Sequence, residues 1–373
     1  MEPRYPAARA VAAKVQAHFA RHLGQQSPAV LPPPTLSEIG AIVDAAFWAS
    51  LRREEGYVPK ISLALVPPER TRQPLLFGRQ LRLEATTLTK VAPAVERAGT
   101  HLGVWVHEDE LRVWGTTRVI PAFCFVLEVA APGLLVVKHH RGDGGKFVNV
   151  AVLEGDQIKM IDEHASQLPD CPALLTSLLG FDVPGARNGP VDVLVDLSVS
   201  MRAHGRGGII LMVPADDDGW KESIVHPIPY AVEPPFAVLA ELLRRAGEEH
   251  EQRAWQEELE DAVQAVAGLT AVDGATVLTD RCELLAFGAK IARRKGSPQV
   301  EQAMVTEPIE GGEVATIHPS MLGGTRHLSA AQFVHDQRKA VALVASQDGR
   351  FTVFTWSPCE ECVHAHRVET LLL

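Results

Sequence analysis

The chain has 373 residues, 46% of them hydrophobic, and a formal net charge of -10. This length predicts two or three domains, each able to bury a core of its own. The acidic balance argues against a broad, charge-driven grip on nucleic acid, although it leaves room for a local basic pocket that holds a nucleotide.

The five cysteines are odd in number and widely scattered, which is not the pattern of a disulfide framework. The first residues lead into an amphipathic pattern rather than the apolar run of a signal peptide. No stretch approaches the roughly 20 apolar residues that a membrane span needs. We therefore expect a cytoplasmic protein.

The amino-terminal half predicts two helices followed by short strands. Apolar residues recur at helical spacing over 7–23 and over 36–51, and Thr35 or Ser37 can cap the second helix. Short apolar runs between Gly, Pro and Asp clusters then predict strands at 61–66, 102–106, 111–115, 124–129, 134–139, 147–152 and 157–161. We expect an α+β, β-rich domain over residues 1–185.

The end of this half carries a loop and a boundary signal. The basic, Gly-rich stretch 138–146 could hold an anion through its backbone N–H groups, or could be an ordinary solvated hairpin turn. Residues 166–179 predict a helix. The Pro- and Gly-rich stretch 181–190 then predicts the domain boundary, so that a second domain spans 190–373.

The second half predicts an α/β domain whose central mixed sheet is flanked by helices. Its first strand, 209–213, is an unbroken apolar run after a glycine turn, which is typical of a strand buried on both faces. The other expected elements are helices at 191–203 and 236–266 (broken near 247–253), a hairpin at 273–288, a loop or lid at 297–320, a short helix from 329, a hairpin of 340–345 with 351–355, and a last strand at 363–368.

Two short motifs in this half have residue types that suit a functional site, the first a catalytic or metal-holding carboxylate and the second an anion-binding helix start. Asp273-Gly274-Ala275 places a carboxylate and a permissive glycine at the mouth of a hairpin. Gly324-Thr325-Arg326-His327 places small residues, a hydroxyl and an arginine at the head of a helix, where free N–H groups attract anions. Each motif is weak alone, and their order along the chain makes them specific.

That order resembles the diadenylate cyclase domain, the nucleotide-binding module also found in the DNA-integrity scanning protein. The resemblance covers roughly residues 191–356 and rests on 207–213, on Asp273-Gly274-Ala275, on 324–327 and on the strand 340–345. His335-Asp336-Gln337 stands near the Ser-Glu-Glu segment of the family. A sensor-like branch of this family carries an extra amino-terminal domain (DACNV-like), which the first half resembles in its position.

The resemblance implies a function and a set of site residues. The family joins two ATP molecules into cyclic di-AMP with Mg²⁺ or Mn²⁺, in an oligomer whose active sites face each other. Asp273 would hold the metal and help to activate the 3′-hydroxyl, and His327 would be catalytic. Gly274, Ala275, Gly324, Thr325 and Arg326 would contact the nucleotide and its phosphates, with His327 and Asp336 as further metal ligands.

The motif departs from the family at Leu328, where a second arginine is expected. Since an apolar side chain cannot grip a phosphate, this departure leaves two functions open. The chain is either an active cyclase or a nucleotide sensor that signals through its amino-terminal domain to an unknown protein partner. A protein with a vestigial pocket is a third interpretation. Base preference is not predicted.

One further cluster has metal-binding residue types. Cys359 and Cys362 have a spacing that suits zinc, and His364 and His366 follow them. On a strand, Cys362, His364 and His366 would line one face, so the alternative is the polar face of an edge strand.

Overall fold

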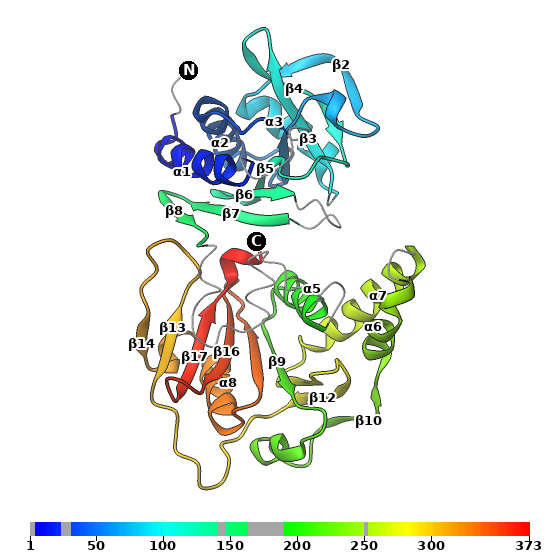
Figure 1. The fold of residues 1–373 in the computed structure, drawn as a ribbon, viewed down its shortest axis with the longest axis vertical. Helices are drawn as coiled ribbons and strands as arrows, with labels where there is room; N and C mark the ends of the chain where they lie inside the picture. Colours follow the sequence, from blue (N-terminus) through cyan, green and yellow to red (C-terminus); the bar gives the residue numbers. More distant parts are fainter. Residues whose placement is uncertain (1–3, 24–30, 98, 141–146, 163–189, 250–252) are drawn as a thin grey trace. The chain divides into compact units, whose positions relative to one another are not determined.

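The computed structural model describes residues 4–23, 31–97, 99–140, 147–162, 190–249 and 253–373 (Figure 1). Contacts within the chain divide it into two units, Met1–Ile161 with Leu373, and Asp162–Leu372. The helix expected at 166–179 lies outside the described residues, and so does the boundary stretch 181–190 apart from its last residue. Among the described helices, none is long and apolar enough to cross a membrane.

The first unit is a mixed sheet with helices packed on one face, which confirms the α+β, β-rich expectation. Its sheet has the order β2-β4-β3-β1-β5-β6-β7-β8, in which only β1 and β3 pair in parallel. The helices are α1 (Pro6–Leu23), α2 (Leu36–Ser50) and α3 (Ala85–Val91). The strands are β1 (Ile61–Leu65), β2 (Leu75–Arg82), β3 (His101–His107), β4 (Glu110–Thr117), β5 (Phe125–Ala131), β6 (Leu134–His140), β7 (Phe147–Glu154) and β8 (Gln157–Met160).

Local signals explain the start of this unit. Thr35 caps α2 as expected: its hydroxyl accepts from the Glu38 N–H at 3.2 Å, and the Glu38 carboxylate accepts from the Thr35 N–H at 2.7 Å. This reciprocal pair satisfies two donors that a helix start leaves free. Lys138 and the two histidines after it belong to β6 rather than to a loop, and residues 141–146 lie outside the described part.

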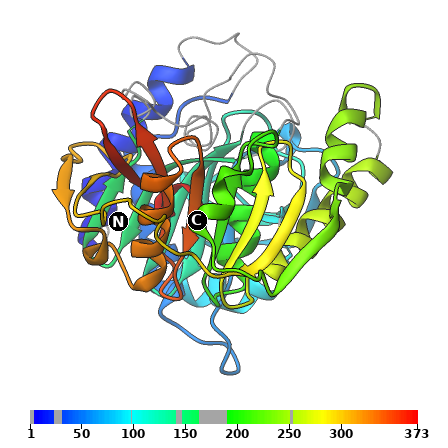
Figure 2. The same cartoon turned by 90° about the horizontal axis from the view of Figure 1, so that it is seen from below.

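The second unit is a mixed sheet between two helical layers, which confirms the expected α/β class (Figures 1 and 2). Its strand order is β10-β12-β11-β9-β15-β16-β17-β13-β14. The helices are α5 (Pro190–Ala203), α6 (Val238–Glu249), α7 (Arg253–Leu269) and α8 (Thr325–Asp336). The strands are β9 (Gly208–Val213), β10 (Tyr230–Phe236), β11 (Ala275–Thr279), β12 (Leu284–Ala289), β13 (Ala303–Thr306), β14 (Ala315–Ile317), β15 (Val341–Ala345), β16 (Phe351–Ser357) and β17 (Cys362–Arg367).

Strand β9 lies in the interior of this sheet. It pairs in parallel with β11 and antiparallel with β15. Ile209 and Leu211 pack with Phe333 of α8 in the core on one face. A Cβ built on Gly208 would lie 3.2 Å from the Met201 sulfur of α5, so α5 covers the other face. The apolar run 209–213 is therefore buried on both sides, as its composition predicts.

The expectation of a loop or lid at 297–320 is wrong in part. This segment contributes β13 and β14, which extend the sheet beyond β17. Both strands are short, and neither shows a clean alternation of apolar and polar residues. Pairing of β13 with β17, and of β14 with β13, stabilises two strands that the local sequence does not predict.

Candidate functional site

The register of three strands brings the two motifs to one edge of the C-terminal sheet. Ala275 of β11 pairs with Ile209 of β9, so Asp273 and Gly274 precede the sheet where β9 begins. Ala345 of β15 pairs with Gly208, so the 346–350 turn lies at the same edge. We call this edge, formed by Gly207, Asp273–Ala275, Gly324–His327 and Ser346–Arg350, the motif edge.

Gly207 explains how the start of α8 reaches this edge. It has a φ of +71°, and a Cβ built on it would lie 2.9 Å from Arg326 Nη1 and 3.1 Å from the Ala345 carbonyl oxygen. Only a glycine provides both the left-handed backbone and the space for the guanidinium. The glycine turn before β9 therefore forms a seat for Arg326.

Gly274 is equally restricted. Its φ is +120°, and a Cβ built there would lie 2.4 Å from the Gly288 carbonyl carbon. A Cβ on Gly288 would in turn lie 2.8 Å from the Tyr230 ring. Tyr230 stacks on Phe287 with ring centroids 4.8 Å apart and is 50% exposed. Gly274, next to Asp273, therefore packs on Gly288, which in turn packs on the ring of Tyr230.

Asp273 itself is exposed and ionised. Its carboxylate is bonded to the Lys290 ammonium, with a side-chain exposure of 85%. Hydrogen bonding and charge attraction from Lys290 hold the pKa of Asp273 below its usual range, and Arg326 lowers it further. The charge of Arg326 thus acts on Asp273, so the structure brings the two motifs together.

Arg326 is a half-buried cation that has no hydrogen bond or ion pair to any other described residue. Helix α8 begins beside it without a side-chain cap, because its N-cap residue is Gly324. A Cβ on Gly324 would meet nothing within 4 Å, and Thr325 is exposed. The first N–H groups of α8 and an uncommitted guanidinium therefore face open space, an arrangement that favours an anion.

His327 lies inside the unit rather than at the surface with Arg326. It is 1% exposed, a Cβ on Gly323 would come within 2.3 Å of its Nδ1, and its ring meets Phe354 edge-on at 6.1 Å. Burial lowers the pKa of His327 to about 4, so the ring is neutral at pH 7. Its Nε2 has no hydrogen-bond partner among the described residues.

The structure does not bring Asp336 to this site. Asp336 ends α8, and at 1.5 Å per residue the 12-residue helix separates it from the Arg326 end by roughly 15 Å. Leu328 is half-buried and packs against the C-terminal core. Among the described residues, no group of three His, Cys, Asp or Glu side chains is placed to hold a metal ion, so Asp273, His327 and Asp336 do not form one site.

The Cys and His side chains near β17 do not form a zinc site in the part of the chain that the structure describes. Cys359 is exposed in the turn before β17, while His364 and His366 are buried on the strand. His366 Nδ1 lies 2.8 Å from Thr306 Oγ1 of β13. The histidines of β17 are therefore held within the sheet, and the zinc hypothesis for Cys359, Cys362, His364 and His366 is not supported.

The sequence did not reveal the 346–350 turn as part of the motif edge. Charge on Asp348 and Arg350 acts on His327, and the Arg350 guanidinium donates to the Leu322 carbonyl oxygen at 3.5 Å. Arg202 of α5 holds the same turn by donating to the Gly349 carbonyl oxygen at 3.1 Å. The Asp-Gly dipeptide of this turn indicated a hairpin, and only the strand register shows where the hairpin ends.

A known protein family matches part of the chain. The family model described as "Probable sensor domain DACNV" matches residues 28–118, which run from before α2 to the end of β4. No curated protein matches the chain. The first unit therefore contains a stretch that is similar to a sensor domain, and the match does not extend into the second unit.

Proposed function

We propose that this chain is a nucleotide sensor similar to diadenylate cyclases, in which the motif edge binds a nucleoside triphosphate and the first unit passes that state to a partner. The observation that carries the proposal is Arg326, a half-buried cation without a partner among the described residues, seated on Gly207 beside Asp273. The match of residues 28–118 to a sensor domain supports the signalling half of the proposal.

Phosphate binding follows from the start of α8. Arg326 can offer two parallel N–H donors to phosphate oxygens, which a lysine could not. The uncapped N–H groups of the helix add a positive dipole end, and the Thr325 hydroxyl adds a donor. The open space at Gly324 lets a phosphate approach the backbone.

Asp273 fits the role of a carboxylate that meets a hydrated metal at the phosphates. It is ionised and exposed, and its ion pair with Lys290 is between two exposed groups, so a stronger cation can displace the lysine at little cost. A bound Mg²⁺ or Mn²⁺ would neutralise charge on the phosphate oxygens. With one carboxylate, Asp273 suits a metal that arrives with the nucleotide.

The stacked rings of Tyr230 and Phe287 supply a surface for a base. Tyr230 is half exposed and adjoins Gly288, whose backbone packs on Gly274. Planar bases stack on such rings with little preference among bases. We therefore expect Tyr230→Ala to weaken nucleotide binding without changing which base is preferred.

Calorimetric titration with ATP and Mn²⁺ tests the proposal. Arg326→Met should weaken binding about 100-fold, because a charge-assisted bidentate contact contributes roughly 3 kcal/mol. The matched control is Arg281→Met, which removes an exposed arginine from the β11–β12 turn at the other end of the hairpin. Equal affinity in the two variants, or no binding by the wild type, would rule the site out.

The cyclase is the second candidate, favoured by the intact and exposed Asp273. In that reaction the 3′-hydroxyl of one ATP attacks the α-phosphorus of another in line, pyrophosphate leaves, and the hydroxyl proton passes to a base or to water. Because each domain would hold one ATP, two copies of the chain would have to face each other. Leu328 weighs against this candidate, since it packs into the core where the family places an arginine.

A mass-spectrometric search for cyclic di-AMP separates the two candidates. After incubation with ATP and Mn²⁺ we expect bound ATP and no product from the wild type. Product that is lost in Asp273→Asn would establish the cyclase instead. Leu328→Arg, which restores the family's residue, sharpens the comparison, because product from this variant alone would show that the site lacks only the second phosphate grip.

A further inference from the structure

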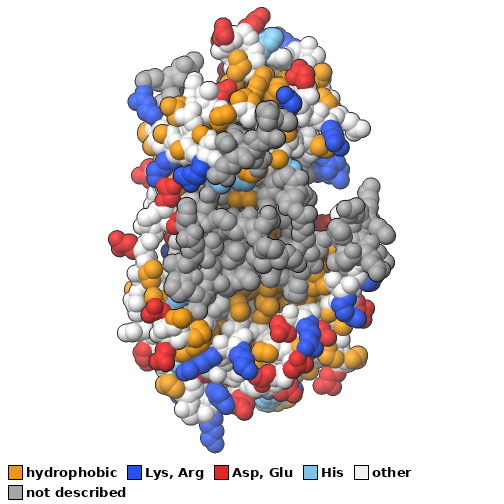
Figure 3. All heavy atoms as spheres, viewed as in Figure 1, with side chains coloured by type: hydrophobic (Ala, Val, Ile, Leu, Met, Phe, Trp, Pro, Cys, Tyr) orange, Lys and Arg blue, Asp and Glu red, His pale blue; other side chains and the backbone are white. Residues whose placement is uncertain are grey.

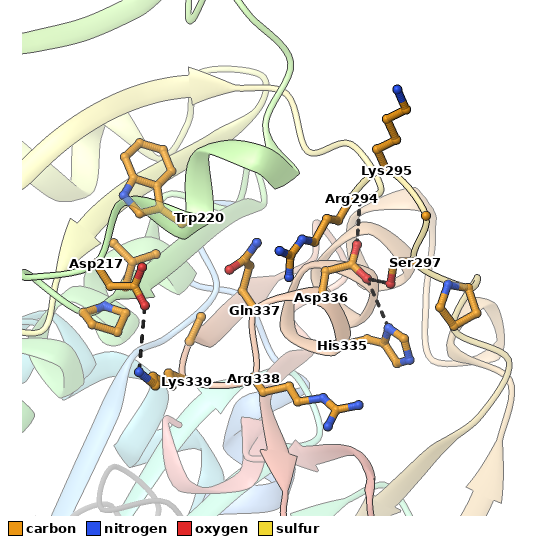
Figure 4. A pocket seen from close by; sticks show the side chains of 15 residues that line it. Asp217, Trp220, Arg294, Lys295, Ser297, His335, Asp336, Gln337, Arg338 and Lys339 are labelled. Carbon is orange, nitrogen blue, oxygen red and sulfur yellow. Dashed lines mark hydrogen bonds and ion pairs between the residues drawn. The ribbon is translucent and has the colours of Figure 1, made fainter.

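A cavity of about 650 Å³ opens at the opposite edge of the C-terminal sheet from the motif edge (Figure 4). It lies where β9 and α8 end and β15 begins, and we call this the cavity edge. Its lining residues come from 213–220, 294–298 and 335–340. A volume of this size is typical of pockets that hold small molecules rather than surfaces that dock proteins.

Asp336 builds the frame of the cavity. Its side chain is fully buried, with 0% exposure, and it accepts from the Arg294 N–H at 2.8 Å and from the Ser297 hydroxyl. Gln332 Nε2 at 3.0 Å and His335 Nδ1 at 3.1 Å complete its surroundings. The carboxylate is thus saturated by donors, and it ties the 294–297 turn to the end of α8.

Cations outnumber anions around this frame. Arg294, Lys295, Arg338 and Lys339 line the cavity, against Asp217 and the buried Asp336. Arg294 is paired with Glu222 at 2.7 Å and Arg338 lies over the Trp356 ring, so the two lysines carry the charge that is open to a ligand. The chain as a whole has a net charge of -10, and positive and negative side chains are interspersed on the face drawn in Figure 3. A local excess of positive charge in a concave site attracts anions, and such a site focuses the field.

Two lysines of this set are available to a ligand. Lys295 stands at the rim without an ion pair or hydrogen bond to any other described residue, and Lys339 reaches Asp217 only at 3.9 Å (Figure 4). The dipole of α8 accounts for basic residues after its last turn, but Arg294 and Lys295 come from a different segment. The excess of cations is therefore not explained by helix stability alone.

The remaining wall is apolar. Val213, Pro214, Trp220, Pro298 and Ala340 contribute carbon surface to the cavity. Trp220 is held in place within the short helical turn Asp218–Ser223 and is 4% exposed. An inorganic anion would leave this surface uncovered, whereas a molecule with an anionic group and a hydrophobic body would fill both parts.

We propose that the cavity edge is a second binding site, separate from the motif edge, for a small phosphorylated molecule with a ring or other apolar body. The phosphate is met by the side chains of Lys295 and Lys339, and the body lies toward Trp220. The site takes a small molecule rather than a nucleic acid, because the cavity is lined by only three short segments and the chain is acidic overall.

Phenyl phosphate is the probe, because it joins one ring to one phosphate, and inorganic phosphate and phenol serve as its separate halves. In calorimetric titrations of the full chain we expect phenyl phosphate to bind at least about tenfold more tightly than either half. The double variant Lys295→Glu with Lys339→Glu should bind phenyl phosphate at least about tenfold more weakly than the wild type, because the new carboxylates repel the phosphate. Both lysines are exposed, so the fold is retained.

Two controls locate the binding. Arg293→Glu reverses the charge of an exposed arginine that adjoins Arg294 but does not line the cavity, and it should change affinity less than twofold. The double lysine variant is also measured in the Arg326→Met background, which removes the phosphate grip of the motif edge, and it should weaken the probe by the same factor there. The proposal fails if the probe does not bind, if Arg293→Glu weakens it as much as the double variant, or if the double variant has no effect in the Arg326→Met background.

Discussion

Each of the two edges of the C-terminal sheet has an aspartate, but the two carboxylates have opposite surroundings. At the motif edge, Asp273 is 85% exposed and has a single lysine partner. At the cavity edge, Asp336 is fully buried and surrounded by donors. Helix α8 links the two edges, beginning beside Asp273 and ending with Asp336.

The two aspartates show how the surroundings of a carboxylate determine its role. A carboxylate whose lone pairs are all engaged stabilises the fold and has nothing left for a ligand. A carboxylate paired only with an exposed lysine keeps its charge and can change partners. The contrast favours a structural role for Asp336 and supports our proposal that Asp273 meets a ligand. Substitutions at the two edges test it.

The largest effect is expected for Gly274→Ala. Its Cβ would meet the Gly288 backbone, and its φ of +120° is strained for any other residue, so the free energy of unfolding should fall by about 3 kcal/mol or more. Gly324→Ala is the matched control in open space at φ -71°, with an expected loss of at most about 1 kcal/mol, because alanine is a poorer N-cap than glycine. Urea unfolding measures both. A similar loss in the two variants would contradict the packing at the motif edge.

Asp336→Ala comes next. It should lower the free energy of unfolding by about 2–4 kcal/mol, because several buried donors lose their acceptor together. ATP affinity should change little once the protein is folded, as the substitution lies at the far end of α8. Asp273→Ala should show the reverse, with unfolding changed by less than about 0.5 kcal/mol and ATP binding lost. An Asp336 variant with the same free energy of unfolding as the wild type would show that the hydrogen bonds of Asp336 do not stabilise the fold.

Acid sensitivity should be carried by buried histidines. Burial lowers the pKa of His327 and of His366 to about 4, from 6.5 for the unfolded chain. Their neutral forms are favoured in the fold, so this part of the stability is complete above pH 6.5 and is lost as the pH falls toward 4. At pH 5 each of these two histidines should lower the free energy of unfolding by about 2 kcal/mol.

Comparing urea unfolding at pH 7 and pH 5 isolates this contribution. The free energy of unfolding should differ less between pH 7 and pH 5 in His327→Gln than in the wild type, by the contribution of one histidine. This holds whatever the substitution does to stability at pH 7. His107→Gln is the control, since His107 is exposed near the β3–β4 turn. The same pH difference in wild type and His327→Gln would show that His327 is not buried as a neutral ring.

The smallest effect is expected for Lys290→Ala. Because the pair with Asp273 is exposed, its loss should change the free energy of unfolding by less than about 1 kcal/mol. Freed of the lysine, Asp273 should support Mn²⁺-dependent ATP binding with equal or higher affinity. A marked loss of ATP affinity in this variant would mean that Lys290, and not a metal, meets the phosphates.

Periodicity predicted most of the fold. The helical stripes at 7–23 and 36–51 and the apolar run at 209–213 became α1, α2 and β9, because each buries the face that its pattern marks. Strand β2 was missed: it is largely exposed, so no alternation marks it. Strands β13 and β14 were missed because they form through pairing, β13 with β17 and β14 with β13, rather than through a local sequence signal.

The site was predicted in part. The motifs identified Asp273 and Arg326, and the structure places them at one edge. Sequence position alone placed Asp336 near the family's acidic segment, but the length of α8 carries it to the other edge. Lys290 and the 346–350 turn were not foreseen, since only strand register determines which loops meet.

Hydrogen–deuterium exchange with and without ATP and Mn²⁺ tests the central claim most directly, because it reads both edges in one measurement. We expect slower exchange in peptides covering 273–276 and 324–328, and no change in peptides covering 294–298 and 337–340. Protection confined to the cavity edge, or no protection at either edge at saturating ATP, would contradict the assignment of the nucleotide to Asp273 and Arg326.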